Sequence, residues 1–581
     1  MKGYNHAERS DYISTSALLP KTHSNIRKTS RTMTSKLSAI ADHARHRSDC
    51  LPKMASKPFK MLLWALILIG IATRLSPLID FDHRLFWQYM TEDGYLVQTV
   101  ARNMALGLGM STANGAIPTN GVQPLATFLY AGLYFISGGS KVGGIVLVTL
   151  FSVVVSAVFA YYAYKVATRI FSSLKHGREL AIISAVLWFA APHIIRHSMN
   201  GLETGLYWAM ILFTVDYYLT NISDGTQSLT FRQRLVLGLL LGLTFLARND
   251  AVFFIGGLLL AHLLLGDDKA GGGRRHRLID CLVAGPISLL VASPWLISNY
   301  ARFGSIIPIS GISESRGAHF GQNLSLIPAN LFDSAFIYTP IPGSIQHTVP
   351  VILISIICVP LAVLGFWFFA ARLTLSSRRF FLASLIFAAG LSIYYGLFFC
   401  APHFLQRYLS PLSPFLWFAT SATTLLLLNM LFRTFEGIHR AAFSLVLVLT
   451  LGAAAFAYSD FVRGYAKGTA QEHEQVVKWV QKNVSDLQWV GAPQSGTLGF
   501  FHDRTVNLDG KVNPDALRSI LEKGDVLEYA RNSKINYIAD WYGMADWVKM
   551  KSDPQFANEF EVVVRDEQLN LGVLRRIKPV K

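Results

Sequence analysis

Long apolar stretches separated by short polar ones dominate the chain between residues 58 and 459. A helix needs about 20 apolar residues to cross a bilayer, so stretches near this length predict transmembrane helices. The candidates lie at residues 61–79, 122–137, 143–170, 179–195, 203–220, 232–247, 251–266, 278–298, 349–371, 380–400, 409–432 and 440–458. The pattern predicts a multi-pass α-helical membrane domain with about 11–12 spans.

Basic residues between these stretches predict how the helices are oriented. Lys and Arg are favoured on the cytoplasmic side of membrane helices. The basic N-terminus and five later loops should therefore be cytoplasmic, the loops being 175–178, 232–234, 274–277, 372–379 and 433–440. With twelve spans the N-terminus and these loops disagree by one crossing, and the short stretch 122–137 is a candidate re-entrant segment. Since the five loops agree with one another, we place the C-terminus outside.

The composition favours a membrane protein and excludes several other classes. Hydrophobic residues make up 52% of the 581 residues and charged residues only 15%, which is too apolar for a soluble protein of this size. Basic residues beside membrane spans report orientation and lipid contact, so the net charge of +17 does not indicate nucleic-acid binding. Residues 1–57 are polar and basic, which predicts a disordered cytoplasmic tail. The four cysteines show no disulfide or zinc spacing.

The composition changes at about residue 460, and the sequence after it predicts a small α/β domain, 460–581. Helical segments are expected at 471–484 and 513–530. Strands are expected at 489–492, 505–508 and 535–539, and a closing hairpin at 560–564 and 571–576. Three aspartates, Asp503, Asp509 and Asp540, are scattered along this segment, and we expect them to cap turns. The segment shows no catalytic constellation, so positioning an acceptor is its expected role.

The loop after the first apolar stretch, residues 80–121, carries the most unusual polar sequence of the membrane domain. It contains the acidic pair Glu92–Asp93, then Arg102, then a segment rich in Gly, Asn and Thr. A carboxylate beside a membrane is costly to desolvate and therefore suggests a function. Asp93 is a candidate catalytic base, and an ordinary acidic first turn of a helix is the alternative.

Several motifs occur in the order found in one family of membrane enzymes. After the acidic pair come ARNMALGLGM and TNGVQPL, then NGLETGL at 200–206, LARND at 246–250, SPWLISNYARFGSIIP at 293–308 and QRYLSPLSP at 406–414. The C-terminal segment adds VVKWVQKNV, GTLGFF and VNLDGKVNPDAL. Over residues 60–581 the chain resembles glycosyltransferases of the GT-C fold, in particular actinobacterial arabinofuranosyltransferases and protein mannosyltransferase-like membrane enzymes. The resemblance implies a catalytic membrane domain at 58–459 and an external α/β domain after it.

The resemblance also implies an activity and a location. Such enzymes, hexosyl- or pentosyltransferases, move a sugar from a polyprenyl-phosphate donor to a hydroxyl of a glycan, lipid or protein acceptor. They lie in the plasma or inner membrane, and their active site faces the external or periplasmic side. Two alternatives stay open, a lipid-linked-sugar transporter or flippase and a non-catalytic subunit of glycan assembly. A transporter should show internal repeats and polar residues near the middle of the membrane, and the sequence shows no convincing repeat.

Glycosyl transfer needs a carboxylate that takes the proton of the acceptor hydroxyl. The resemblance assigns this role to Asp93. Its neighbour Glu92 is the alternative base, or it tunes Asp93 through like-charge repulsion. Gly94, which follows the pair, departs from the usual pattern of the family and changes the packing expected around the base.

The reaction also needs cations that neutralise the departing phosphate. The resemblance favours Arg407 first, then Arg248, then Arg102. Each has an alternative role that stays open. Arg407 begins a predicted span and is also suited to anchor it by snorkelling. Arg248 lies two residues from Asp250 and is also suited to an ion pair with it, and Arg102 to an ion pair with the acidic pair.

Glu203 and His197 are candidates for binding the acceptor. Glu203 lies at the start of a predicted helix, where a carboxylate has a structural role as the alternative. Histidines of the external segments show no convincing ligand spacing, so no protein-held metal site is predicted, although a divalent metal cofactor stays open; they are His193, His197, His319, His347 and His403.

Overall fold

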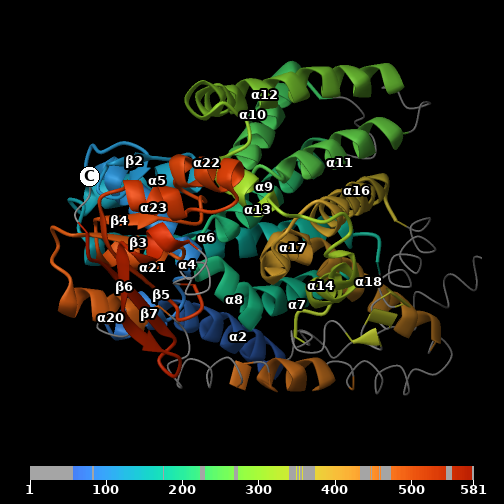
Figure 1. Ribbon diagram of the computed structural model, residues 1–581. Helices are drawn as coiled ribbons and strands as arrows, with labels where there is room; N and C mark the ends of the chain where they lie inside the picture. The colour runs from blue at the N-terminus through green and yellow to red at the C-terminus, as the bar shows by residue number, and fades with distance from the viewer. Residues whose placement is uncertain are drawn as a thin grey trace, which may run out of the picture. The chain divides into compact units, whose positions relative to one another are not determined.

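Figure 1 shows the computed structural model of the chain. It describes residues 57–81, 84–174, 176–222, 229–266, 273–338, 373–431, 473–544 and 553–578, with a few positions between 348 and 357 and between 445 and 459. These residues belong to one compact unit, 54–581. The predicted tail 1–57 lies outside the described residues except for Lys57.

Four helices of the described residues are long and apolar enough to cross a membrane. They are α2 (Lys57–Leu75), α6 (Lys141–Ile170), α12 (Arg274–Phe303) and α16 (Leu375–Leu397). A fifth span results if α7 (Gly177–Ala190) and α8 (Pro192–Met199) are taken together, although they are bent by 57°. Proline lacks the backbone donor that a continuous helix needs, so Pro192 accounts for the break. The chain is a multi-pass helical membrane protein.

Five further helices account for most of the other predicted spans. They are α5 (Pro124–Ile136), α9 (Thr204–Asn221), α10 (Phe231–Ala247), α11 (Ala251–Leu264) and α18 (Ser413–Leu431). The predicted span 349–371 lies largely outside the described residues, and of the predicted span 440–458 residues 445, 448–456 and 458 are described, all of them helical. Ten of the predicted 11–12 spans therefore correspond to these helices, with α7 and α8 taken as one, and a further helical stretch is described within 440–458; not all have the length of a full crossing.

The ends of several helices meet at the basic start of α16. Ser377 at the start of α16 donates its hydroxyl to the carbonyl of Ile170 at 2.9 Å, and Ser376 donates to that of Ile222 at 3.3 Å. Arg379 Nε donates to the carbonyl of Leu265 at 2.8 Å. The ends of α6, α9 and α11 thus meet the start of α16, as expected for loops on one side of a membrane.

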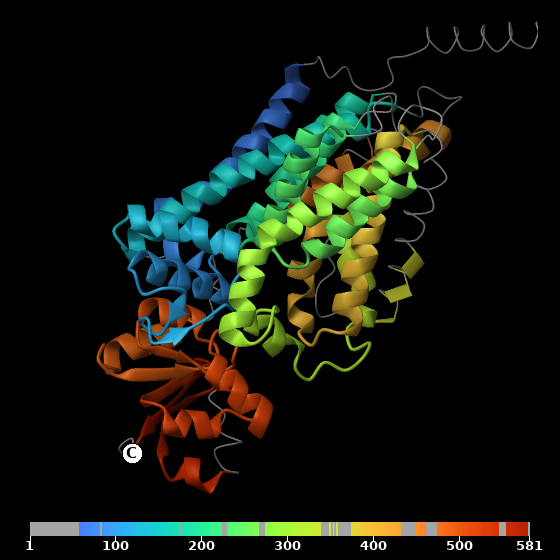
Figure 2. The same ribbon diagram turned by 90° about the horizontal axis from the view of Figure 1, so that it is seen from above.

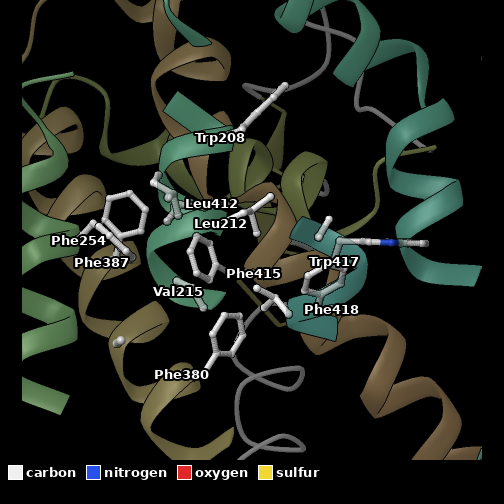
Figure 3. Close-up of a cluster of buried hydrophobic side chains, with 14 of the residues drawn as sticks. Trp208, Leu212, Val215, Phe254, Phe380, Phe387, Leu412, Phe415, Trp417 and Phe418 are labelled. Atoms are coloured by element: carbon white, nitrogen blue, oxygen red, sulfur yellow. The ribbon is translucent and has the colours of Figure 1, made fainter. Parts of the chain in front are cut away.

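A large aromatic cluster holds the helices together near the segment 405–412 (Figure 3). Phe387 contacts Phe254 and Phe415, with ring centroids 5.7 and 6.0 Å apart. Trp208 places its indole N–H 3.1 Å from the carbonyl of Ser410. Buried aromatic rings contribute large packing areas, and a paired indole N–H avoids a desolvation penalty. The cluster therefore fixes the short segment that carries Arg407.

The segment predicted as a C-terminal domain, 460–581, contains a five-stranded sheet in the order β4-β3-β5-β7-β6. Its strands are β3 (Trp489–Ala492), β4 (Thr505–Asn507), β5 (Ile535–Asp540), β6 (Phe560–Asp566) and β7 (Leu571–Arg576). The first three are parallel, and β7 and β6 form the antiparallel hairpin that the sequence predicts. All five predicted strands are present.

Helices cover both faces of this sheet (Figure 2). One hydrophobic cluster joins the sheet to α20 (Glu474–Asn483) and α21 (Gly496–Phe501), and the other joins it to α23 (Leu527–Asn532). The predicted helical segment 513–530 is divided into α22 (Pro514–Lys523) and α23, because Gly524 takes a left-handed φ of 84° that ends α22. Helix α21 was not predicted.

Candidate active site

A cavity of about 400 Å³ lies where the membrane helices meet the C-terminal domain. Its polar lining comes from the first loop, from helix ends and from the C-terminal domain, and includes Asp93, Glu203, Arg248, Asp250, Glu314, Tyr395, Arg407, Tyr408 and Lys511. Its apolar lining includes Phe253, Leu296, Ile306 and Ile307. Four of the seven predicted site residues therefore line one cavity.

Helix α4 (Glu92–Ala105) carries the acidic pair in its first turn. Thr91 caps this helix by accepting a hydrogen bond from the N–H of Gly94 at 3.2 Å. An α-helix has 3.6 residues per turn, so neighbouring side chains point about 100° apart. Glu92 and Asp93 consequently face different surroundings, and only Asp93 lines the cavity.

Asp93 lies between two cations. Its Oδ2 accepts a hydrogen bond from Nη1 of Arg407 at 2.6 Å, and its Oδ1 lies 3.9 Å from Nζ of Lys511. Burial opposes ionisation of Asp93, but the charges of Lys511 and Arg407 outweigh it and hold the pKa of this carboxyl below its usual value. The structure thus presents an ionised carboxylate to the cavity.

Glu92 is bound to the C-terminal domain and does not face the cavity. Its Oε2 accepts hydrogen bonds from the backbone N–H and the hydroxyl of Thr497 at 2.8 and 2.6 Å, and Oε1 accepts from the N–H of Gly496. A β-carbon on Gly496 would lie 2.0 Å from the carbonyl oxygen of Glu92. The close contact between the starts of α4 and α21 therefore requires glycine at position 496. Glu92 therefore joins the membrane domain to α21 and is poorly placed as the alternative base.

We expect Glu92→Gln to loosen α21 from α4. Hydrogen bonds to a charged group contribute about 1.5–3 kcal/mol each, so amide hydrogen exchange at residues 496–501 should accelerate by at least about tenfold. Glu474→Gln is the matched control, because Glu474 pairs with Lys478 on the surface of α20. Equal exchange at 496–501 in both variants and in the unmodified protein would contradict this role of Glu92.

Gly94 allows close contact between α4 and the segment NGLETGL, residues 200–206. A β-carbon on Gly94 would lie 2.2 Å from the carbonyl oxygen of Asn200. The same carbonyl accepts hydrogen bonds from the N–H and the hydroxyl of Thr91 at 3.2 and 3.1 Å. Gln98 donates to the carbonyl of Gly201 at 2.9 Å. The departure from the family pattern at Gly94 thus allows the loop after α8 to pack directly on α4, beside Asp93.

Arg248 is a buried cation with two carboxylate partners. Its Nη2 lies 3.1 Å from Oδ2 of Asp250 and its Nε 3.8 Å from Oε1 of Glu203. Tyr395 donates its hydroxyl to Asp250 at 2.7 Å. The ion pair with Asp250, which was the alternative role predicted for Arg248, is therefore present. Arg248 also lines the cavity. Glu203 lies just before α9, as predicted, but its carboxylate is directed to Arg248.

Arg407 lies in α17 (Leu405–Leu409), with its guanidinium 4.4 Å from the ring of Phe404 and 5.0 Å from that of Tyr408. Nη2 donates to the hydroxyl of Tyr408 at 3.2 Å. A guanidinium packed between aromatic rings is held in place as well as stabilised. Because the side chain is only 15% exposed and points to Asp93, it does not extend towards lipid as a snorkelling anchor would.

Arg102 and His197 do not line this cavity. Arg102 lies nine residues after Asp93, about 14 Å along α4, so the predicted pair with the acidic pair is out of reach. It instead pairs with Asp503 at 3.2 Å and donates to the carbonyl of Gly139 at 2.8 Å. Asp503, expected to cap a turn, thus forms an interdomain ion pair. His197 is buried in α8 beside His193.

Three charged residues of the cavity, Asp250, Glu314 and Lys511, were not assigned to the site from the sequence. Lys511, in the C-terminal domain, places its Nζ 2.7 Å from Oε1 of Glu314 in α13 (Ile309–Ser315). Burial disfavours its charge, but the carboxylates of Asp93, Asp509 and Glu314 raise the pKa of Lys511, so it stays protonated. The segment VNLDGKVNPDAL was noted as a motif, but nothing local shows that it reaches Asp93.

Metal binding finds no support in the described part of the chain. No group of three or more His, Cys, Asp and Glu side chains there is arranged to hold a metal ion. In the cavity the carboxylates of Asp93, Glu203, Asp250 and Glu314 are each paired with Arg407, Arg248 or Lys511.

Comparisons with solved structures show a likeness over most of the chain. ArnT from Cupriavidus metallidurans, bound to undecaprenyl phosphate, has a TM-score of 0.54 at 13% identity, and the match covers 90% of this chain and 98% of ArnT. The archaeal oligosaccharyltransferase AglB from Archaeoglobus fulgidus, in complex with an inhibitory peptide and a dolichol-phosphate, has a TM-score of 0.50 at 13% identity, covering 87% of this chain and 73% of AglB. At these identities the likeness shows the fold.

Sequence comparisons add little. A family model described as a domain of unknown function, DUF8728, matches residues 462–571. No curated protein sequence matches the chain. The matched range corresponds to most of the predicted C-terminal domain.

Proposed function

We propose that this chain, a multi-pass membrane protein with the GT-C fold, is an integral membrane glycosyltransferase. It would move a sugar from a polyprenyl-phosphate donor to a hydroxyl of a glycan, lipid or protein acceptor. The observation that carries the proposal is the pairing of Asp93 with Arg407 in a cavity that also has an apolar wall. ArnT and AglB bind a polyprenyl or dolichol phosphate in the structures similar to this one, which favours the same class of donor here.

In the proposed reaction Asp93 acts as the base. The acceptor oxygen forms a bond to the anomeric carbon while its proton passes to the carboxylate of Asp93. The bond between the anomeric carbon and the phosphate oxygen breaks, and its electron pair leaves with the polyprenyl phosphate. The products are the glycosylated acceptor and polyprenyl phosphate, and no oxidant or reductant is needed.

The arginines serve the donor phosphate in this proposal. Arg407 is bound to Asp93 through one guanidinium nitrogen, and a phosphate at the donor position competes for the same group. Its binding would release Asp93 to the acceptor, so donor binding prepares the base. Arg248 lies close by, since its Nη1 is 3.5 Å from the carbonyl oxygen of Arg407. Glu203 remains our candidate for contacting the acceptor, because it lines the cavity.

The apolar wall suits a prenyl chain. Phe253, Leu296 and Ile307 line the cavity beside the charged groups, and contact with apolar surface binds hydrocarbon without directional demands. Arg248 follows the end of α10, whose start carries Arg232 and Arg234, and Tyr395 lies near the end of α16, whose start carries Arg378 and Arg379. By the positive-inside rule this supports a site and a C-terminal domain on the external or periplasmic side.

A transfer assay with a panel of polyprenyl-phosphate sugars tests this function. Purified protein in lipid vesicles, given donor and hydroxyl acceptors, should release polyprenyl phosphate together with a glycosylated product. Asp93→Asn protein, reconstituted at the same amount, is the control. Movement of the intact donor across the bilayer without cleavage would favour a flippase, and donor binding without either process would favour an assembly subunit.

A further inference from the structure

Lys511 brings a charge from the C-terminal domain into the cavity of the membrane domain. Its Nζ lies 2.7 Å from Glu314, 3.8 Å from Asp509 and 3.9 Å from Asp93. It also lies 4.9 Å from the centre of the Phe404 ring. The side chain is only 14% exposed. One ammonium group therefore forms ion pairs with three carboxylates from three different segments.

The backbone around Lys511 is fixed by its own turn. Asn507 Oδ1 accepts a hydrogen bond from the N–H of Gly510 at 3.0 Å, and Asn513 Nδ2 donates to the carbonyl of Asn507 at 2.7 Å. The N–H of Lys511 donates to Oδ1 of Asp509 at 2.9 Å. Such side-chain bonds stabilise one turn conformation. Asp509 therefore caps a turn, as predicted, and the turn presents Lys511.

The first loop of the membrane domain meets this turn closely. A β-carbon on Gly121 would lie 2.0 Å from the carbonyl oxygen of Lys511, so only glycine permits the contact. Ser313 donates its hydroxyl to the carbonyl of Asp509 at 2.9 Å. The turn is thus held between the loop 80–121 and α13, which places Lys511 in a defined position relative to Asp93.

The charges that face Asp93 come from three segments. Arg407 and His403 lie on its α17 side, Lys511 and Asp509 on the C-terminal side, and Glu314 on α13, with the Tyr408 hydroxyl near Arg407. Burial disfavours the carboxylate, and the two nearest cations oppose burial. If a donor phosphate takes Arg407, Lys511 is the cation that remains beside Asp93.

We propose that Lys511 is a positioning residue for the catalytic base: its ammonium keeps Asp93 ionised and oriented, so the C-terminal domain completes the active site. This inference rests on the proposed function, in which Asp93 is the base. It differs from a role in acceptor positioning alone, because it assigns to the C-terminal domain a charge that acts on the reacting centre.

The test compares the pH dependence of kcat/KM for Lys511→Met, Lys511→Arg and the unmodified protein between pH 5 and 9. The acidic limb of this profile reports the base in the free enzyme. Loss of a nearby cation disfavours a carboxylate, so the limb should move to higher pH in Lys511→Met. We expect activity at pH 5, relative to pH 8, to fall about three- to tenfold further than in the unmodified protein. Lys511→Arg should restore most of it.

Two controls separate this inference from its alternatives. Lys523→Met removes an exposed lysine of the same domain and should leave the profile unchanged. Amide exchange at residues 505–516 shows whether Lys511→Met keeps the turn folded. A folded Lys511→Met protein with an unchanged profile would overturn the inference while leaving the proposed function intact. Full transfer activity in Asp93→Asn would instead overturn the role of Asp93 as the base, on which this inference rests, whereas absence of transfer by the unmodified protein with the whole donor panel would overturn the proposed function itself.

Discussion

Replacing Asp93 with Asn should lower kcat/KM for sugar transfer by about 10²–10⁴-fold, the range typical of a lost general base. The change keeps the shape of the side chain and an oxygen that accepts the hydrogen bond from Arg407. It removes the carboxylate that would receive the proton. Among the described residues, Asp93 is the only carboxylate of the first loop that lines the cavity. We therefore expect the substitution to slow the chemical step and to leave the folding of the protein unchanged.

The donor should still bind to Asp93→Asn protein. Arg407 loses its anionic partner in this variant and is free for phosphate, so donor affinity measured with polyprenyl phosphate should be unchanged or higher. Glu92→Gln is the neighbouring control and should lose much less activity, because Glu92 faces α21. Normal transfer in Asp93→Asn, or an equal loss in both variants, would argue against Asp93 as the base.

Local patterns were sufficient to predict most of the elements. The bounds of β3 and β7 agree with the predicted ranges 489–492 and 571–576. The division of 513–530 at Gly524 follows a known rule for helix ends and was overlooked. Helix α21 was missed because six residues, GTLGFF, are too short to show a helical period.

The site was predicted only where its residues lie near one another along the chain or match the family. Asp93, Arg407, Arg248 and Glu203 share the cavity, but the separate roles of Glu92 and Asp93 follow from helical geometry that the pair alone does not display. The place of Lys511 in the cavity could not be predicted from the sequence. It depends on the close contacts that Gly121 makes with Lys511 and that Gly496 makes with Glu92. Such contacts depend on tertiary packing and leave no periodic signal in the sequence.

The second large effect concerns Arg407. As the glycosidic bond breaks, the phosphodiester of the donor becomes a monoester, and negative charge grows on the leaving oxygen. A guanidinium fixed by the rings of Phe404 and Tyr408 needs little reorganisation to meet this charge. Its stabilisation is therefore larger in the transition state than in the ground state, which is the condition for lowering a barrier.

Arg407→Ala should cost about 2–4 kcal/mol in transition-state stabilisation, measured as the change in kcat/KM for the donor. Arg407→Lys should retain part of the activity, because lysine keeps the charge but lacks the planar fork of donors. Arg302→Ala, which removes an exposed arginine at the end of α12, is the control and should be near normal. If Arg407→Ala leaves both turnover and donor KM nearly unchanged, Arg407 has only a structural role, and the buried Arg248 becomes the phosphate ligand to test.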